Sequence, residues 1–196
     1  MSARLLAATA LAAAALLSAA PAQAVPQPVT PPPTSSWSKI DRGIFGMHVS
    51  TLSAGKEFPG PLGGVRLWDT GVRWDQVEKA QGEYDWDRLD TAVATAEDAG
   101  AREIMYVLGS TPDWAAKYIR PDTYYYGGGT ASEPAKLSYW RDWVRAVATR
   151  YQGRITSYQI WNEANLASFW APESTAHWKS ITIMTDITAD KNRAID

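Results

Sequence analysis

The chain has 196 residues, a formal net charge of -2 and no cysteine. This charge provides no basic stripe, so nucleic acid is not an expected partner. The lack of cysteine excludes a disulfide framework and a thiol nucleophile. With two histidines and no cysteine, a dedicated metal site is not expected either.

The first 24 residues have the pattern of a secretory signal peptide. Arg4 supplies the positive start, residues 5–17 are almost all Ala and Leu, and residues 22–24 form the small-x-small cleavage pattern Ala-Gln-Ala. The apolar run is shorter than the roughly 20 residues of a spanning helix. We therefore expect cleavage after Ala24, a secreted product and no membrane partner after cleavage. The alternative is a retained membrane anchor.

Residues 25–36 are rich in Pro, Thr and Ser, so they cannot pack a core and are expected to form a disordered leader. Residues 37–196 are expected to form one domain, long enough to bury a core. Short apolar runs predict strands over 43–50, 65–69, 103–108 and 155–161. Helical spacing predicts helices over 87–99, over a segment containing 140–151, and over about 174–195. A turn-rich connection, 58–64, and a polar loop, 118–132, lie between them.

Alternating apolar strands and helices predict an α/β fold with a parallel sheet and helices outside it. We expect about the first four β/α units of a TIM (β/α)8 barrel, which takes about 250 residues when complete. Residues 37–196 would then be its N-terminal part, unless two copies pair or the sheet closes in a smaller way. An open doubly wound sheet is the alternative. The three glycines at 127–129 do not run from a strand into a helix, so they provide no phosphate loop to support it.

The segment 158–165 carries the clearest chemical signal. A short apolar strand ends in Asn162 and Glu163 with aromatic residues on both sides. A carboxylate at the mouth of a buried strand is suited to proton exchange, and aromatic faces are suited to a sugar ring. We therefore predict carbohydrate chemistry with Glu163 as the proton donor. The alternative is an ordinary acidic residue at the start of a helix.

Several motifs together resemble the clan A glycoside hydrolases. Residues 65–69, 74–78 and 82–90 resemble the second β/α unit of that clan, residues 112–115 its third-strand loop, and Trp161-Asn162-Glu163 its fourth-strand motif. The family 39 and family 5 types, which include β-xylosidases and cellulases, are the nearest. The resemblance covers roughly residues 40–196. It implies a (β/α)8 barrel with its site at the carboxyl ends of the strands and a β-linked polysaccharide or oligosaccharide as substrate.

The resemblance also implies roles for three residues. Glu163 would be the general acid/base, and Asn162 would hydrogen-bond the 2-hydroxyl of the sugar. Arg66 would hold the nucleophilic carboxylate ionised, with an ion pair inside the barrel as the alternative. No cofactor is expected, because two carboxylates and water suffice for this chemistry.

Other candidates lie at strand ends. His48 would donate to a sugar hydroxyl or be a core histidine. Trp68, Trp114 and Trp170 would supply a stacking platform, although each could instead pack against a loop. The tyrosines at 124–126 could edge a cleft or lie in a surface loop. Trp140 and Trp143 fall on the apolar stripe of the second predicted helix, so they are expected in the core.

The chain departs from the clan in its second carboxylate. The clan's nucleophile is a Glu at the end of the seventh strand, about 5 Å from the acid/base. Asp69 and Asp113 are the other carboxylates expected near this rim, and neither matches that position. We therefore expect a glycoside hydrolase sequence that is inactive by itself. The alternatives are a non-catalytic carbohydrate-binding half-barrel and an interaction protein that pairs through its sheet edges.

Overall fold

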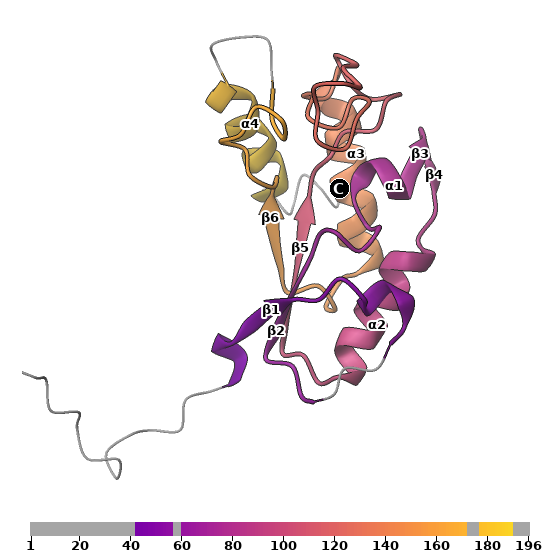
Figure 1. Cartoon of the computed structure of the whole chain (residues 1–196), viewed down its shortest axis with the longest axis vertical. Helices are drawn as coiled ribbons and strands as arrows, with labels where there is room; N and C mark the ends of the chain where they lie inside the picture. Colours follow the sequence, from indigo (N-terminus) through magenta and orange to yellow (C-terminus); the bar gives the residue numbers. More distant parts are fainter. Residues whose placement is uncertain (1–41, 57–59, 172–176, 190–196) are drawn as a thin grey trace, which may run out of the picture. The chain divides into compact units, whose positions relative to one another are not determined.

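A computed structural model describes residues 42–56, 60–171 and 177–189 (Figure 1). The predicted signal peptide (1–24) and leader (25–36) lie outside the described residues, as do both ends of the last predicted helical segment. Within the described ranges, no helix has both the length and the apolar character needed to cross a bilayer.

Four parallel strands form the main sheet. They are β1 (Gly46–His48), β2 (Gly64–Leu67), β5 (Glu103–Leu108) and β6 (Ser157–Ile160), in the spatial order β1-β2-β5-β6. The spatial order therefore follows the chain, whereas a doubly wound sheet reverses its order at a switch point. The predicted α/β fold with a parallel sheet is confirmed.

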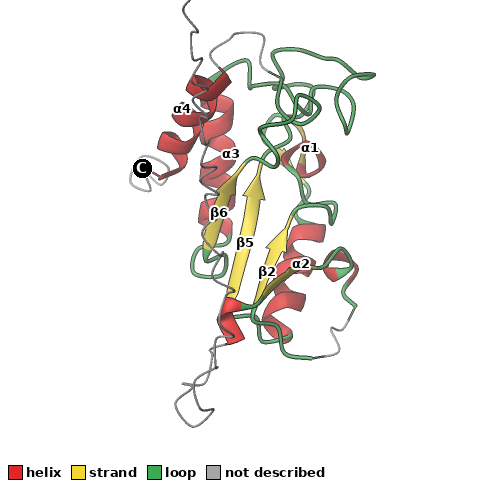
Figure 2. Ribbon diagram, turned by 60° about the vertical axis from the view of Figure 1, so that its left-hand side comes forward, coloured by secondary structure: helices red, strands yellow, loops and turns green. Residues whose placement is uncertain are grey.

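Two amphipathic helices cover one face of this sheet, as Figure 2 shows. The first is α2 (Asp87–Asp98), and the second is α3 (Leu137–Arg150). Each follows a strand along the chain and turns its apolar stripe inward, as the helical spacing predicts. The buried residues of the two helices are Leu89, Ala92, Val93, Ala96, Trp140, Trp143, Val144 and Val147. A further helix, α4 (His177–Ala189), packs on α3 and contributes the buried Met184.

Stacked aromatic rings fill the space beside α3. The Trp143 ring lies between those of Trp74, at 5.9 Å, and Trp86, at 5.8 Å, and both pairs are nearly parallel. Tyr84 extends the stack, with its ring centre 4.9 Å from that of Trp86. Trp140 and Trp143 are fully buried, so their predicted place in the core is confirmed.

The first strand differs from its prediction. The strand predicted over 43–50 spans only Gly46–His48, and a 3-10 turn, η2 (Arg42–Ile44), precedes it. The side chains of Ile44 and Phe45 are 70% and 64% exposed, so apolar character in this run does not mark burial. A second 3-10 turn, η3 (Leu52–Ala54), follows β1 and packs on α2.

The segment between β2 and α2 contains three elements that the sequence did not predict. They are the short helix α1 (Trp74–Val77) and the antiparallel strands β3 (Glu78–Ala80) and β4 (Glu83–Tyr84). The buried Glu78 carboxylate holds them together, because it accepts hydrogen bonds from Trp74 Nε1 at 2.6 Å and from the Gly82 amide at 2.8 Å. Charged residues in this hairpin hide the alternation that would have revealed its strands.

Candidate active site

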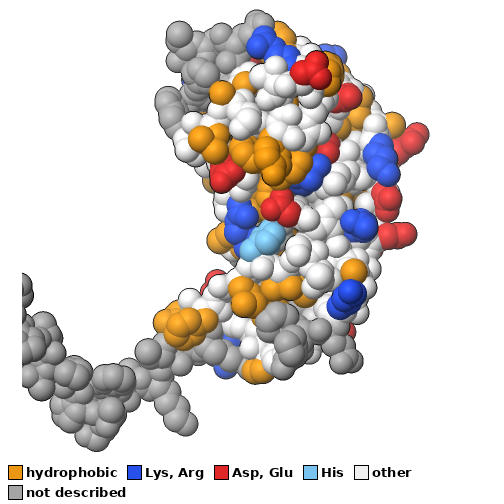
Figure 3. All heavy atoms as spheres, in the orientation of Figure 1, with side chains coloured by type: hydrophobic (Ala, Val, Ile, Leu, Met, Phe, Trp, Pro, Cys, Tyr) orange, Lys and Arg blue, Asp and Glu red, His pale blue; other side chains and the backbone are white. Residues whose placement is uncertain are grey.

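A hollow of about 410 Å³ lies at the carboxyl ends of β1, β2 and β6. In Figure 3 it shows as a histidine between basic and acidic side chains, below a band of hydrophobic ones. We call it the site hollow. It combines polar side chains with an aromatic wall, and its lining residues are His48, Arg66, Asp69, Asn162 and Glu163 together with Trp68, Tyr125, Tyr126 and Phe169.

The turn after β6 holds Asn162 and Glu163 in an unusual backbone conformation. Trp161 and Glu163 have positive φ angles of 65° and 48°, which are uncommon for residues other than glycine and unfavourable for a bulky one. Gly109 leaves room for this turn, because a Cβ there would lie 3.2 Å from the Trp161 ring, closer than ordinary van der Waals contact. Hydrogen bonds from Trp161 N to Leu108 O, at 2.7 Å, and from Trp161 Nε1 to Phe169 O, at 2.6 Å, secure the turn. Strain of this kind clusters at functional sites.

Arg66 links β2 to this turn. Its Nε donates to Gln159 Oε1 at 3.0 Å and its Nη2 donates to Asn162 Oδ1 at 2.7 Å. The Gln159 amide in turn donates to Trp161 O at 2.7 Å. The guanidinium thus donates to two side-chain amide oxygens. In the described part of the chain, Arg66 makes no ion pair. The alternative internal ion pair is therefore not formed among the described residues, whereas the predicted role of Arg66 toward a nucleophilic carboxylate stays a prediction.

The Arg66 contact fixes the orientation of the Asn162 amide. A guanidinium only donates, so the Asn162 oxygen must face it and the amide nitrogen must point elsewhere. That nitrogen lies 3.4 Å from Glu163 Oε2, a long hydrogen bond. Asn162 is buried, whereas Glu163 is exposed at the mouth of the hollow. The described residues therefore leave the Glu163 carboxylate open to solvent.

A second chain of polar contacts lines the hollow. Tyr126 Oη donates to Asp69 Oδ1 at 2.7 Å and accepts from Trp68 Nε1 at 3.1 Å. The other carboxylate oxygen of Asp69 lies 3.7 Å from His48 Nε2. Burial, reinforced by the bond to Asp69, raises the pKa of Tyr126 to about 12, so its hydroxyl stays protonated at neutral pH. His48 is exposed and faces this chain, so it is not a core histidine.

The aromatic wall joins loops that are far apart in sequence. The Tyr125 ring stacks on Phe169 at 4.8 Å with an interplanar angle of 23°, and Tyr125 N donates to Ser168 O at 2.9 Å. Tyr125 is 67% exposed, so one side of this stack faces solvent. Phe169 was not predicted as a site residue. Its position directly before Trp170, in the loop after β6, was the only available indication.

Two predicted platform residues lie outside the site hollow. Trp114 donates through Nε1 to Glu78 O at 2.8 Å and packs edge-on against Trp74. Trp170 is 2% exposed and packs against Trp161, with ring centres 4.5 Å apart. Both have the packing role that the sequence left open as an alternative. Trp68 lines the hollow, although it is also largely buried.

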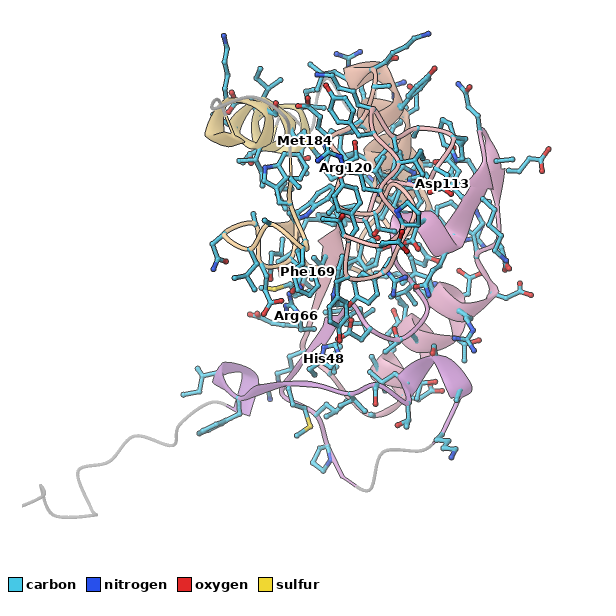
Figure 4. All side chains as sticks on the ribbon, turned by 45° about the horizontal axis from the view of Figure 1, so that its top comes forward. His48, Arg66, Asp113, Arg120, Phe169 and Met184 are labelled. Carbon is cyan, nitrogen blue, oxygen red and sulfur yellow. The ribbon has the colours of Figure 1, made fainter. Side chains whose placement is uncertain are left out.

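Asp69 is the second carboxylate of the site hollow, among the residues that the structure describes. Asp113 lies outside it and accepts a hydrogen bond from Gly129 N at 2.6 Å. Figure 4 shows His48, Arg66 and Phe169 close together and Asp113 apart from them. No group of three or more acidic or histidine side chains in the described ranges could hold a metal ion.

A chain-ordered parallel sheet with outer helices and a polar, aromatic-walled hollow at the carboxyl ends of its strands is the arrangement found in part of a TIM barrel. Among solved structures, the chain is similar to a monomeric β-xylosidase from Caulobacter crescentus, with a TM-score of 0.53 and 23% identity over 76% of this chain and 33% of that one. This likeness confirms, for the fold, the resemblance noted in the sequence.

Two other similar structures are a family 39 glycoside hydrolase from Bacteroides cellulosilyticus and xylanase B from Clostridium stercorarium, each with a TM-score of 0.44. Their identities are 16% and 18%, over 74% and 76% of this chain and 29% and 47% of theirs. The chain thus spans about a third of the length of the β-xylosidase. No family model and no curated protein matches the sequence.

Proposed function

We propose that this chain provides the acid/base side of a retaining glycoside hydrolase site that acts on β-linked oligosaccharides or polysaccharides. The observation that carries the proposal is the pairing of Asn162 and Glu163 on a strained turn at the carboxyl end of a barrel-type strand, in a hollow with an exposed aromatic wall. The likeness of the fold to a β-xylosidase supports β-xylosides as the first substrates to test.

In this mechanism Glu163 works twice. Its carboxyl proton goes to the glycosidic oxygen as the bond to the anomeric carbon breaks, and the resulting carboxylate later takes a proton from the water that releases the sugar. The exposed position of Glu163 gives both the leaving group and water access to it. Asn162, oriented by Arg66, donates its amide N–H to the 2-hydroxyl, a contact that strengthens in the transition state.

The proposal assigns no nucleophile within the described residues. A retaining enzyme needs a second carboxylate about 5 Å from the first. The only other carboxylate in the described lining, Asp69, is held by Tyr126 and lies beside His48. We therefore expect residues 1–196 alone to bind sugar without hydrolysing 4-nitrophenyl β-xyloside, and sustained turnover by the purified chain would contradict this.

The acid/base role can be tested without turnover. A xylose-derived glycoimidazole places a basic nitrogen where the glycosidic oxygen would lie, so it gains affinity from a proton donor at that point. We expect Glu163→Gln to weaken glycoimidazole binding about 100-fold, within the range by which transition-state analogues exceed substrates. Xylobiose affinity should change less than about twofold, because ground-state binding uses the other groups. Isothermal titration calorimetry measures both.

A second candidate function is carbohydrate binding without catalysis. The exposed aromatic wall of Tyr125 and Phe169 favours it, because such a surface can hold a sugar ring without any nucleophile. This alternative expects Glu163→Gln to leave both ligands' affinities unchanged. Equal losses for the two ligands would contradict both candidates in their present form.

We also propose that the protein is secreted, on the basis of residues 1–24. N-terminal sequencing of the protein exported by its native host should begin at Val25. A product that retains residue 1 would contradict this.

A further inference from the structure

Two more hollows lie beside the site hollow. The middle hollow, of about 280 Å³, lies between α1 and the loop after β5 and is lined by Asp75, Lys79, Asp113, Tyr126 and Gly128, among others. The outer hollow, of about 510 Å³, lies between α1 and the start of α2 and is lined by Asp75, Lys79, Asp85, Asp87 and Arg88, among others.

Shared residues connect the three hollows in a row. Tyr126 lines both the site hollow and the middle hollow. Asp75 and Lys79 line both the middle hollow and the outer hollow. A long ligand that extends from the site hollow past Tyr126 would therefore reach the middle hollow. Beyond Asp75 and Lys79 it would reach the outer hollow. In Figure 4 the labelled Asp113 marks the middle hollow, apart from His48 and Phe169 of the site hollow.

Specific contacts hold in place the lining residues that neighbouring hollows share. The Arg73 guanidinium lies 3.7 Å from the centre of the Tyr126 ring and makes a two-point hydrogen bond to Asp75, at 3.0 Å on each oxygen. On the opposite wall, Asp113 Oδ1 accepts from Gly129 N at 2.6 Å. The walls are thus tied across the loops after β2 and β5, and a bound ligand would not have to order them.

The lining favours an uncharged, hydroxyl-rich ligand. The carboxylates of Asp75, Asp85, Asp87 and Asp113 outnumber the cations Lys79 and Arg88 in the two hollows, and Arg73 already neutralises Asp75. The side chains of Lys79 and Asp87 make no hydrogen bond or ion pair with other described residues, so a donor and an acceptor are available. Excess negative charge would repel a uronate or a sulfate.

We infer that the three hollows form one groove that binds several successive residues of a linear, neutral glycan on one side of Glu163. This inference rests on the proposed function and extends it to the length and charge of the substrate. Sugar units in the middle and outer hollows would add affinity through contacts to Lys79 and Asp87, whereas a disaccharide would occupy the site hollow alone.

The test measures affinity against chain length for residues 1–196 by isothermal titration calorimetry. Neutral xylo-oligosaccharides and cello-oligosaccharides of two, four and six units serve as probes, together with a six-unit galacturonate oligomer. We expect affinity to rise at least tenfold from two to six units in one neutral series, and the galacturonate oligomer to bind at least tenfold more weakly than that hexamer.

Variants locate the added affinity. Lys79→Ala and Asp87→Asn should each weaken hexamer binding about two- to tenfold, the effect of one lost hydrogen bond, and leave the dimer unchanged. Lys56→Ala is the matched control, because Lys56 is also an exposed lysine and lines none of the three hollows.

The outcomes separate this inference from the proposed function. Equal binding of dimer and hexamer, or an unchanged hexamer affinity in both variants, would overturn the groove while the glycoimidazole result could still stand. Equal binding of the galacturonate oligomer would overturn its preference for neutral glycans. Failure of every sugar and of the glycoimidazole to bind would remove the proposed function and the groove together.

Discussion

The two regions that flank the sheet use the same residue types for different purposes. On the helix-covered face, Trp74, Trp86 and Trp143 stack ring on ring. At the carboxyl ends of the strands, Trp68 and Tyr126 use their polar atoms in a hydrogen-bonded chain that ends at Asp69. Burial stabilises the first region, whereas specific polar contacts and a strained backbone shape the second.

This difference shows how the fold can tolerate strain at the site. The positive φ angles of Trp161 and Glu163 each cost on the order of 1–3 kcal/mol. Full burial of one large apolar side chain contributes a comparable amount, roughly 1.5–3 kcal/mol. The core on the helix-covered face therefore offsets the conformation that positions Asn162 and Glu163.

The largest expected effect comes from breaking the aromatic stack. Trp143→Ala removes a fully buried ring that packs on two others, and should lower the free energy of unfolding by about 3–5 kcal/mol. Urea denaturation followed by circular dichroism measures this. Trp143→Phe is the control and should lose less, because it keeps a ring and removes an indole N–H that has no hydrogen-bond partner among the described residues. If the alanine variant lost less than about 1 kcal/mol of unfolding free energy, the aromatic stack would not be a main source of stability.

A smaller effect is expected at the glycine loop of the middle hollow. Gly128 has φ +52°, and a Cβ there would lie 2.2 Å from Asp113 Oδ1, whereas Gly82 has φ +78° and open space around it. Gly82→Ala should cost about 1–2 kcal/mol, the penalty of the left-handed conformation. Gly128→Ala should cost about 1–3 kcal/mol more, because of the clash. Matched urea titrations compare the two, and equal costs would show that the Asp113 side chain simply moves away.

The next effect concerns the polar chain of the site hollow. Arg66→Lys keeps the charge but loses the fork that reaches Gln159 and Asn162 together. Xylobiose affinity should fall about tenfold, or about 1.4 kcal/mol, with a smaller change in stability. Calorimetry measures the affinity, and Arg145→Lys on α3 serves as the control. If Arg66→Lys binds xylobiose as tightly as the wild type, the Asn162 amide does not depend on the Arg66 guanidinium for its orientation.

The smallest effect is expected from charge on the helix-covered side. Asp90 of α2 pairs with Arg150 of α3, and the hydrogen bond from Arg150 lowers the pKa of Asp90 below 3.8. Because the pKa is lower in the folded chain, the pair contributes stability above pH 3.8 and loses it as the pH falls through the folded value. Since the pair is partly exposed, Asp90→Asn should cost at most about 1 kcal/mol at pH 7. Urea titrations at pH 7 and pH 3 should show this difference shrinking at the lower pH.

The periodic parts of the fold were predictable from sequence. Helix α2 was predicted over 87–99 and spans Asp87–Asp98, and the strand predicted over 103–108 is β5. Both segments bury one regular face, so their pattern is local. The first strand and the hairpin of Glu78 were not predictable in the same way. Ile44 and Phe45 are exposed, although their apolar side chains suggest a buried strand. Strand β3 depends on the Glu78 carboxylate, which accepts a hydrogen bond from the Gly82 amide four residues later.

The site was predictable where it depends on the end of a single strand. Asn162 and Glu163 lie at the carboxyl end of β6, as the sequence indicated. The aromatic wall depends on contacts between loops, which sequence spacing does not reveal. Trp114 and Trp170 turn toward the core, whereas Phe169 reaches the hollow through the pairing of its loop with Tyr125. A tryptophan at a strand end can point into the core or toward the site, and contacts with residues distant in sequence determine its direction.

The hydrogen bond from Trp68 to Tyr126 makes the intrinsic fluorescence of Trp68 a reporter of ligand binding. Trp68 is the only tryptophan in the described lining of the site hollow, and its indole N–H donates to a hydroxyl that faces the cavity. The emission wavelength of an indole depends on the polarity around its N–H group. Replacement of water by a ligand near Tyr126 would therefore change the fluorescence of this one tryptophan, while the stacked indoles beside α3 report on unfolding.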